Sequence, residues 1–381
     1  MRRKRIMVLG TGTFQKGLLE FLKKQGLYVI GVTNKPHEES ATACHEIIDV
    51  SYQEHEEVLR QYKKKHCTQV LTVASEAALY TQSYIQEPEN HKGNSIAFIS
   101  RFQDKTSYKK LLFEQKLGPQ VMNGAVPENM KPPYFIKPKT GSGSHKIRLV
   151  ECVDQKIHEP DKQLYFNERF IEGKEYGCNF FLEKGKLIYH ITTLKKNNKF
   201  HVPVAHLITN TPVQEEMRSL IYKVDIALNL NEGFFNMDVI KTGTGLKVID
   251  LSPRLGGNAM TEISRMGYSI SEYDFLLKWH LRQKVSAIHT VFKKYIGVYV
   301  IGSLKAGTLS HISVIPDNLQ PNITEIFWNK RVGDSVEVFD SGSKHLGYVI
   351  FTGISKENLF AIYGQVLNYE WFELEEIDVD K

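Results

Sequence analysis

The sequence predicts an α/β protein built from three domains, and three observations lead to this prediction. The chain has 381 residues, which is more than a single hydrophobic core usually supports. Strand and helix patterns alternate over residues 1–100, as expected for a doubly wound parallel βαβ domain. Hairpin patterns dominate residues 101–290, which predicts a central α+β domain, and residues 291–381 have the composition of a β-rich C-terminal lobe.

The N-terminal domain is expected to begin with a strand, a glycine turn, a helix and a second strand over residues 5–34. A helix over residues 53–66 should precede a buried strand over 68–75. A further helix is expected over residues 76–85, and a strand over 95–100, with the sequence SIAFIS. This order predicts a parallel sheet with helices on both faces.

The central domain is expected to open with a helix over residues 105–118 that ends at Gly118, because glycine commonly follows the last turn of a helix. Further hairpins and helices follow, with hairpins over 134–150, 164–194 and 234–252 and helices over 214–230 and 271–283. In the C-terminal lobe, a helix is expected to begin at Ser355, with Glu357 in its first turn.

Composition and charge are those of an ordinary globular protein, with 41% apolar and 24% charged residues. The net charge of +6 fits an anionic small molecule as well as it fits nucleic acid. The apolar run after the basic opening MRRKR is too short for a signal peptide, and no run approaches the ~18 apolar residues that cross a membrane. The four cysteines are far apart and signal neither zinc nor disulfides. We expect a cytoplasmic protein with no nucleic-acid and no membrane partner.

The first glycine turn reads GTGTFQKG and runs from Gly10 to Gly17. Its last glycine lies two residues further along than in the dinucleotide-binding fingerprint. The second strand ends at Asn34, where an acidic ligand for a ribose is expected in that fold. Tight packing of the strand against the helix is therefore favoured over NAD binding.

A second glycine-rich stretch, residues 132–150, reads PPYFIKPKTGSGSHKIRLV. Two β-rich runs flank Lys137 and the segment GSGS at 141–144. The backbone N–H groups and serine hydroxyls of such a loop can wrap phosphate oxygens, and Lys137 adds a positive charge beside them. The alternative is an exposed hairpin with a basic rim.

A hairpin folded about Thr244 places two aspartates opposite each other. Asp238 then faces Asp250, and Asn236 faces Ser252, on one side of the sheet. The side chains expected on the other side are Met237, Val239, Ile249 and Leu251. Opposed carboxylates destabilise a sheet unless a cation lies between them, and a pair of them suits Mg²⁺ or Mn²⁺. The alternative is a register shifted by one, in which the aspartates never meet.

Arg254 and the segment Gly256-Gly257-Asn258 follow this hairpin at once. The guanidinium of Arg254 is placed to hold a carboxylate or phosphate, and bare N–H groups of Gly256 and Gly257 to stabilise an oxyanion. Both are weaker candidates for a substrate-binding site, as is Glu76, which follows the strand over 68–75. Glu76 either binds a substrate ammonium group or caps the next helix, and the cap is slightly favoured. The alternative for the segment after the hairpin is a turn with a solvated arginine.

The sequence resembles the ATP-grasp enzymes in four segments that occur in the same order. The matching pieces are DKTSYKKLL at 104–112, YFIKPKTGSGS at 134–144, NERFIEGKEY at 167–176 and the metal hairpin. The resemblance implies a hinged small subdomain over residues 125–172 that is mobile. It also implies ATP and Mg²⁺ or Mn²⁺ as cofactors. The implied ATP-binding residues are Lys105, Lys137, Ser142, Gly143, Ser144, Glu168, Arg169, Phe170, Ile171 and Glu175, and the implied metal ligands are Asp238 and Asp250. The resemblance implies that NERFIEGKEY is the adenine hinge, in which the Glu168 side chain and the Arg169 carbonyl group face the exocyclic amine. It also implies that the Ile171 amide meets a ring nitrogen and that Glu175 binds the ribose hydroxyls.

Within that group, the C-terminal lobe resembles the L-amino-acid ligases. The resemblance implies a ligase in which a substrate carboxylate takes the γ-phosphate, forms an acyl phosphate and is attacked by an amine. Lys137 and Arg254 are the implied catalytic residues, with small-molecule carboxylate and amine substrates and a possible homodimer. Two departures matter, because Asp250 stands where a longer glutamate is usual and Ser252 where an asparagine is usual. A bicarbonate-activating enzyme and a non-catalytic ATP-binding module remain alternatives.

Overall fold

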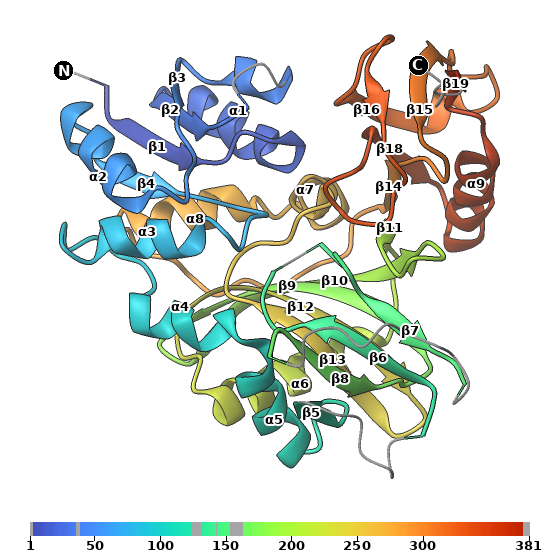
Figure 1. Cartoon of the computed structure of the whole chain (residues 1–381), viewed down its shortest axis with the longest axis horizontal. Helices are drawn as coiled ribbons and strands as arrows, with labels where there is room; N and C mark the ends of the chain where they lie inside the picture. The colour runs from blue at the N-terminus through green and yellow to red at the C-terminus, as the bar shows by residue number, and fades with distance from the viewer. Residues whose placement is uncertain (1–2, 36–38, 124–130, 142, 153–162, 376–381) are drawn as a thin grey trace.

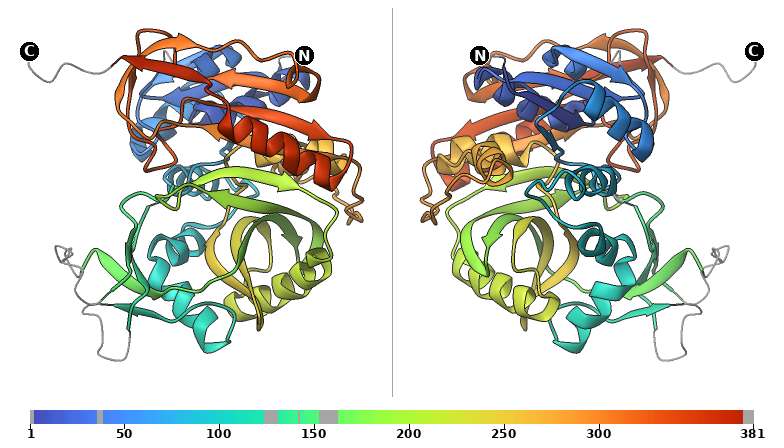
Figure 2. Two further views of the ribbon diagram at one scale, coloured as in Figure 1. Left: turned by 90° about the vertical axis from the view of Figure 1, so that its right-hand side faces the viewer. Right: turned by 90° about the vertical axis from the view of Figure 1, so that its left-hand side faces the viewer.

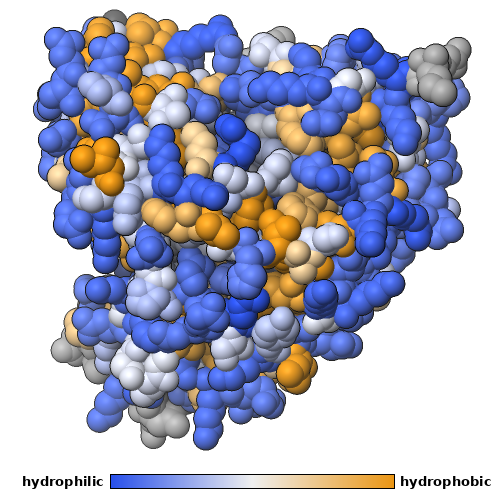
Figure 3. Space-filling view, turned by 180° about the vertical axis from the view of Figure 1, so that it is seen from behind, coloured by the Kyte–Doolittle hydropathy of each residue, from blue (hydrophilic) through white to orange (hydrophobic). Residues whose placement is uncertain are grey.

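The computed structural model describes residues 3–35, 39–123, 131–141, 143–152 and 163–375. The N-terminal elements and the C-terminal elements lie side by side, above the hairpins of the central region (Figures 1 and 2). In the described residues, no helix is both long enough and apolar enough to span a membrane. Seen from behind, the surface is mainly hydrophilic, with apolar side chains in scattered groups (Figure 3).

The N-terminal sheet is parallel, as the sequence predicts. Its strands are β1 (Arg5–Leu9), β2 (Tyr28–Thr33), β3 (Glu46–Asp49) and β4 (Gln69–Leu71), in the order β3-β2-β1-β4. The associated helices are η1 (Thr13–Gln15), α1 (Lys16–Lys24), η2 (Glu39–Ala43), α2 (His55–Lys64) and α3 (Leu79–Gln86). Since parallel strands end at one edge of the sheet, the glycine turn after β1 and Glu76 after β4 are brought to the same edge.

The strand expected over residues 95–100 is instead the start of helix α4 (Ile96–Gln103). Ser95 caps this helix, because its hydroxyl accepts a hydrogen bond from the Phe98 amide at 3.1 Å. Ile99 and Phe102 are buried one turn apart. A short apolar run has no periodicity that separates a strand from a helix, which is why the prediction is wrong.

The first glycine turn serves packing, as favoured above, although the partner of Gly17 is a helix rather than a strand. A Cβ atom on Gly17 would lie 1.8 Å from Oε1 of Glu262 and 2.8 Å from the Tyr273 hydroxyl. Gly10 has φ +90, a conformation that other residues rarely adopt. The turn therefore lets α1 approach the helices that carry Glu262 and Tyr273.

Helix α5 (Lys105–Glu114) begins as expected but ends before Gly118. Asp104 caps its start by accepting from the Thr106 amide at 2.9 Å. The left-handed residue after the helix is Lys116, with φ 59, so Gly118 as the terminating residue is wrong. Gly118 lies close to β13, and a Cβ atom there would be 3.2 Å from the Val248 carbonyl oxygen.

The small sheet is antiparallel and contains the Lys137 stretch. Its strands are β5 (Val121–Asn123), β6 (Tyr134–Pro138), β7 (Arg148–Val150) and β8 (Tyr165–Arg169), in the order β5-β8-β6-β7. The hairpin expected over 134–150 is confirmed by the pairing of β6 with β7. The hairpin expected over 164–194 is wrong in its bounds, because β8 pairs with β5 and β6, and the hairpin is formed by β9 (Lys174–Glu183) and β10 (Lys186–Asn197).

The large sheet crosses the expected boundary between the central domain and the C-terminal lobe. Besides β9 and β10, its strands are β11 (Pro203–Ile208), β12 (Gly233–Thr242), β13 (Gly245–Ser252), β14 (Tyr295–Ile301), β16 (Ile323–Trp328) and β18 (Gly347–Gly353). Their order is β13-β12-β9-β10-β11-β14-β18-β16, and helix α6 (Val213–Leu228) contacts β10 and β13. The domain boundaries at residues 100 and 290 stay predictions.

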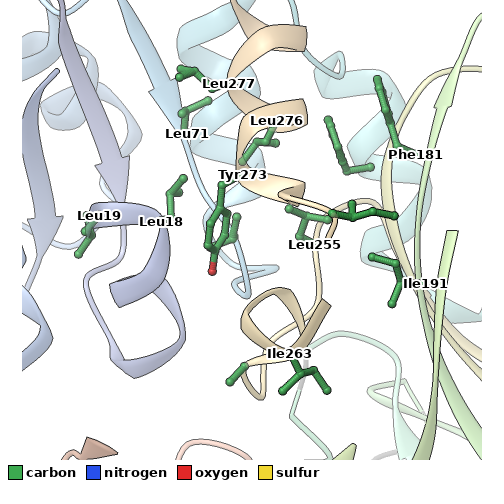
Figure 4. Packing of buried hydrophobic residues seen from close by; sticks show 14 of the residues in the cluster. Leu18, Leu19, Leu71, Phe181, Ile191, Leu255, Ile263, Tyr273, Leu276 and Leu277 are labelled. Carbon is green, nitrogen blue, oxygen red and sulfur yellow. The ribbon is translucent and has the colours of Figure 1, made fainter. Parts of the chain in front are cut away.

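Helices α7 (Met260–Tyr268) and α8 (Glu272–His280) join the N-terminal domain to the large sheet. One hydrophobic cluster contains Leu18 and Leu71 of the N-terminal domain, Leu276 of α8 and Phe181 of β9 (Figure 4). This packing holds the edge of the N-terminal sheet, with the glycine turn and Glu76, in a fixed position relative to the end of β13.

The remaining elements belong to the C-terminal lobe. They are β15 (Gly307–Ile312), β17 (Ser335–Val336), β19 (Phe372–Glu375), η3 (Gln320–Asn322) and α9 (Lys356–Asn368), with a sheet order of β17-β15-β19. The cap expected at Ser355 is confirmed, since its hydroxyl accepts from the Asn358 amide at 3.1 Å.

Candidate active site

Two cavities meet at the opposed aspartates. A cavity of about 680 Å³ lies between the small sheet and the β9–β13 part of the large sheet. A cavity of about 940 Å³ is lined by the first glycine turn, the end of β13 and the C-terminal segment 328–346. The residues that line both are Gly143, Ser144, His145, Asp238, Asp250 and Ser343. A ligand in one cavity therefore reaches a ligand in the other beside the two carboxylates.

The predicted pairing of the aspartates is confirmed. Asp238 faces Asp250 and Asn236 faces Ser252 in the β12–β13 register. The turn differs from the prediction, because Thr242 pairs with Gly245 and the register shifts between Asp238 and Val239. The turn is one residue shorter than predicted, and the register shift offsets this difference. The pairing at the site is therefore the predicted one.

Ile249 is the extra residue of this β-bulge, since Val239 pairs with Val248 and Asp238 with Asp250. The prediction that Ile249 points away from the aspartates is therefore wrong. Ile249 lines the smaller cavity together with Ile240, and its carbonyl oxygen accepts a hydrogen bond from Lys109 Nζ. The other three residues of the predicted apolar face, Met237, Val239 and Leu251, are buried.

Asp250 is held by Lys105 and Tyr108. Lys105 Nζ lies 2.9 and 3.1 Å from the two carboxylate oxygens, and the Tyr108 hydroxyl donates at 2.7 Å. Burial alone would raise the pKa of Asp250, but Lys105, Lys109 and the Tyr108 hydroxyl outweigh it and lower the pKa below its usual range. Asp250 is thus a carboxylate at neutral pH, as a metal ligand has to be.

Asp238 is held by Lys195, a residue on β10 that the sequence did not indicate. Lys195 Nζ lies 2.7 Å from Oδ2 of Asp238 and 3.3 Å from Oε2 of Glu175. Burial lowers the pKa of Lys195, but Asp238 and Glu175 raise it by more than burial lowers it. Lys195 is therefore an ammonium group at neutral pH. Lys195 thus links the predicted ribose ligand Glu175 to the predicted metal ligand Asp238.

Glu168 is almost completely buried between two lysines. Its Oε2 lies 2.6 Å from Lys109 Nζ, and its Oε1 accepts from Lys137 Nζ. Burial raises the pKa of Glu168, and the two ammonium groups outweigh this and lower it. The structure therefore gives Glu168 the role of positioning both lysines, while its predicted contact with the adenine amine remains a prediction.

The expected adenine hinge lines the smaller cavity. Arg169 ends β8, Phe170 and Ile171 follow it, and all three line this cavity together with Glu175. Apolar side chains supply further walls, namely Phe135, Ile147, Leu164, Ile240 and Ile249. The rings of Phe135 and Phe170 have centroids 5.6 Å apart. A planar aromatic base fits a slot with such walls.

The glycine–serine loop contacts two other parts of the chain. Gly143 accepts a hydrogen bond through its carbonyl oxygen from the Gly342 amide at 2.8 Å. The Ser144 hydroxyl donates to the His201 carbonyl oxygen at 3.1 Å. Ser142, which was also predicted to bind phosphate, lies outside the described residues.

Arg254, Glu76 and Ser252 form one cluster at the wall of the larger cavity. Oε1 of Glu76 accepts from Arg254 Nη2 at 3.2 Å and from the Ser252 hydroxyl. Helix α3 begins at Leu79 with Ala78 at its N-cap and no side-chain cap. The capping interpretation of Glu76 is therefore wrong, and its carboxylate instead joins the N-terminal domain to the end of β13.

The amide of Gly256 is not bare, so that part of the oxyanion prediction is wrong. Gly256 is buried, and its N–H donates to Oδ1 of Asn179 at 3.0 Å. Asn236 Nδ2 donates to the same oxygen at 3.0 Å. Gly257 and Asn258 line the larger cavity, so their place beside a substrate is still a prediction.

The donor set fits a magnesium ion that depends on a phosphate ligand. In the described part of the chain, no three His, Cys, Asp or Glu side chains are grouped as a metal site. Asp238 and Asp250 provide two opposed carboxylates, and Mg²⁺ typically uses one or two together with water and phosphate oxygens. The pair therefore suits a metal that arrives with a nucleotide better than a metal bound by protein alone.

Lys109, Lys195 and Tyr108 are the site residues that the sequence did not indicate. Lys109 is one helical turn after Lys105, which places both ammonium groups on one face of α5. Lys195 is a buried residue near the end of the largely buried strand β10, and a lysine in such a position requires a carboxylate partner. These two patterns are the signals that the sequence offers. The carboxylates that pair with the two lysines are known only from the fold.

Comparison with known proteins bears on the identity of this site. Residues 102–258 match the family model described as the ATP-grasp domain. The chain contains an ATP-grasp domain. The match runs from the residues before α5 to the segment after β13, and it includes each predicted ATP and metal residue. No curated protein matches the sequence.

Solved structures share the fold over nearly the whole chain. An L-amino acid ligase from Bacillus licheniformis has a TM-score of 0.82 at 17% identity, covering 99% of this chain and 100% of that chain. Phosphoribosylglycinamide synthetase from Anaerococcus prevotii has a TM-score of 0.75 at 19% identity, with coverages of 99% and 100%. The biotin carboxylase domain of a 2-oxoglutarate carboxylase from Hydrogenobacter thermophilus, in complex with MgADP, has a TM-score of 0.75 at 13% identity, with coverages of 98% and 91%. At these identities the likeness shows the fold alone.

Proposed function

We propose that this chain is an ATP-dependent carboxylate–amine ligase. It forms an amide or peptide bond on an amino acid or small peptide through an acyl phosphate, and it releases ADP and phosphate. The observation that carries the proposal is the meeting of the two cavities at Asp238 and Asp250. Phosphoryl transfer requires the phosphate donor and the acceptor to approach each other beside groups that neutralise charge.

The smaller cavity is the proposed ATP site. The hinge Arg169–Ile171 and the apolar walls bind the base, and Glu175 binds the ribose. Lys105 and Lys137 line the same cavity and neutralise the phosphates. Gly143 and Ser144 cover the phosphates where the two cavities join. Bound Mg²⁺ at Asp238 and Asp250 supplies charge neutralisation for the phosphates.

The larger cavity is the proposed site of the carboxylate and amine substrates. Arg254 Nη2 lies on its wall, 3.2 Å from Glu76. In the proposal, the guanidinium holds the substrate carboxylate or its phosphate, and Glu76 carries the opposite charge needed beside a substrate ammonium. Enclosure by the Gly143 loop and segment 341–345 limits the access of water to the acyl phosphate. A cytoplasmic location and a homodimer remain part of this proposal.

The departures at Asp250 and Ser252 do not remove charge from the site. Asp250 keeps a carboxylate opposite Asp238, and the Ser252 hydroxyl donates to the Glu76 carboxylate instead of offering an amide. Glu76 thus brings a further carboxylate to the end of β13 from the N-terminal domain. This contact favours a catalytic site over a passive ATP-binding module.

The experiment is a release assay with product identification. The chain is incubated with ATP, Mg²⁺ and mixtures of the twenty amino acids or dipeptides, ADP is measured, and masses that correspond to loss of water between two amino acids are sought. We expect ADP release that requires an amino acid and matches the amount of amide product. Asp238→Asn should abolish release, whereas Asp274→Asn, a partly exposed residue of α8, is the matched control.

The outcomes separate the alternatives. ADP release driven by bicarbonate alone would replace the amide proposal by bicarbonate activation. Tight binding of ATP with Mg²⁺ but no ADP from any carboxylate would leave a binding module. The proposal holds only if product amide and ADP appear in equal amounts.

A further inference from the structure

Lys195 is a buried lysine that lines the proposed ATP site, and the proposed function gives it no role. Its side chain is 5% exposed, whereas the next residue, Lys196, is exposed on the other face of β10. The Lys195 ammonium group contacts two carboxylates, with Asp238 at 2.7 Å and Glu175 at 3.3 Å. A buried ammonium group with two carboxylates near it is a fixed counter-ion rather than a mobile surface charge.

The second metal ligand has the same kind of partner. Lys105 Nζ contacts both oxygens of Asp250, and its side chain is 13% exposed. Each of the opposed carboxylates thus already carries an ammonium group. A metal ion that binds at Asp238 and Asp250 has to compete with Lys195 and Lys105 for the same oxygens.

We propose that Lys195 is an exchangeable counter-ion that keeps free metal ions from Asp238 and releases this carboxylate when a metal ion arrives with nucleotide. The inference rests on the proposed function of the site. Glu175 gives the displaced ammonium group a second carboxylate at 3.3 Å, so it keeps a partner after it leaves Asp238. Lys105 has the phosphates of the nucleotide as its alternative partner.

The charges of the site explain why a free metal ion and a metal ion that arrives with nucleotide differ in their binding at Asp238. Hydrated Mg²⁺ gives up its water reluctantly, and Asp238 offers it a carboxylate that is already neutralised. Nucleotide phosphates add both metal ligands and new anions for the lysines. The exchange therefore becomes favourable only when metal and phosphate are present together, which sets an order of binding.

The experiment measures Mn²⁺ binding in the absence of nucleotide by the loss of the free Mn²⁺ electron paramagnetic resonance signal. Lys195→Met removes the charge and keeps a similar length. We expect it to bind Mn²⁺ about tenfold more tightly than the unaltered protein, because Asp238 and Glu175 then lack their counter-ion. Lys196→Met is the matched control, since it removes a neighbouring charge that faces away from the site, and it should leave Mn²⁺ binding unchanged.

Two further variants protect the test against misfolding. Lys195→Arg keeps the charge and should keep Mn²⁺ binding weak. Glu175→Gln removes the alternative partner of the ammonium group, so Mn²⁺ should strengthen ADP binding less than it does in the unaltered protein. Circular dichroism establishes which variants are folded.

The inference is overturned if folded Lys195→Met binds Mn²⁺ no more tightly than the unaltered protein. It is also overturned if the unaltered protein binds Mn²⁺ equally well with and without ADP. Neither readout requires turnover, so a failure of the ligase proposal, seen as no ADP release with any amino acid, is recognised separately.

Discussion

Four carboxylates and four lysines form ion pairs at the smaller cavity, and these pairs hold each charged side chain in place. Lys109 and Lys137 share Glu168, Lys195 bridges Glu175 and Asp238, and Lys105 holds Asp250. The hairpin pattern indicated both aspartates and the glycine-rich stretch indicated Lys137, whereas Lys105 and both glutamates were implied by the resemblance to the ATP-grasp enzymes. The sequence did not indicate Lys109 and Lys195, because a lysine outside such segments becomes informative only when its carboxylate partner is known.

Lys109→Met tests this pairing at its most buried point. The substitution leaves Glu168 with one lysine and leaves the Ile249 carbonyl oxygen without its side-chain donor. We expect a loss of about 3 kcal/mol in the free energy of unfolding, since breaking a buried ion pair is costly. Urea denaturation measures it, with Lys110→Met, an exposed neighbour on α5, as the control. Equal stability of the two variants would contradict the role of Lys109.

Glu272 gives the protein a dependence on pH that one substitution should remove. Burial raises its pKa to about 7, although hydrogen bonds from Asn179, Ser264 and Tyr189 oppose the shift. The unfolded chain ionises near pH 4.5 while the folded chain holds the proton to about pH 7. Stability contributed by this group therefore falls by up to about 1.4 kcal/mol per pH unit as pH rises through that window.

Glu272→Gln should remove this fall, measured as the difference in free energy of unfolding between variant and unaltered protein at pH 5 and pH 8. The difference is needed because buried His206 and His345 act in the opposite sense. Burial lowers their pKa to about 3 and about 4, so they add stability as pH rises. A difference that is the same at both pH values would show that Glu272 does not titrate as described.

At the scale of elements, the β12–β13 hairpin shows how far a pattern can be followed. Alternation and a turn centred on Thr244 predicted that Asp238 faces Asp250, and the pairing is confirmed because a bulge offsets a turn that is one residue shorter. The bulge at Ile249 was not predictable, because nothing in the local composition distinguishes an inserted residue from a longer turn. The same limit applied to residues 95–100, where a short apolar run folded as helix α4.

Gly17→Ala tests the contact between α1 and the helices α7 and α8. The added methyl group would lie 1.8 Å from Oε1 of Glu262, which also accepts from the Tyr273 hydroxyl at 2.6 Å. We expect a loss of about 1–3 kcal/mol from overpacking. Gly364→Ala in α9 is the control, since nothing lies within 4 Å of its Cβ position and alanine should stabilise that helix by about 0.5–1 kcal/mol. Thermal denaturation with opposite shifts for the two variants would agree with this account.

At the scale of the whole molecule, the sequence predicted the parallel N-terminal sheet and the hairpins over 134–150 and 234–252 correctly, whereas the bounds of the hairpin expected over 164–194 were wrong. It did not predict that the strands on both sides of residue 290 share the large sheet. Such pairing joins residues far apart in the chain, and strand composition carries no information about the partner. The cluster of Glu76, Ser252 and Arg254 was missed for the same reason, since it forms only after the N-terminal domain docks through α8.

Glu76→Ala tests whether that docking contributes to catalysis. The side chain contacts Arg254 and Ser252, and it lines the larger cavity only. We expect kcat to fall roughly tenfold to a hundredfold through misplacement of Arg254, with the affinity for ATP nearly unchanged. Isothermal titration with ATP and a steady-state assay separate the two effects. Glu56→Ala, at an exposed position of α2, should change neither, and a parallel loss of ATP affinity would argue against this role for Glu76.

The hydrogen bond between the Gly342 amide and the Gly143 carbonyl oxygen bears on how this protein can be dissected. The segment matched as the ATP-grasp domain ends at residue 258, so a fragment cut to those limits would contain the proposed nucleotide ligands but lack Gly342 and Ser343. Such a fragment would also expose the edge of β11 that β14 covers. The recognised module is therefore not an autonomous unit here, and experiments on nucleotide binding call for the intact polypeptide.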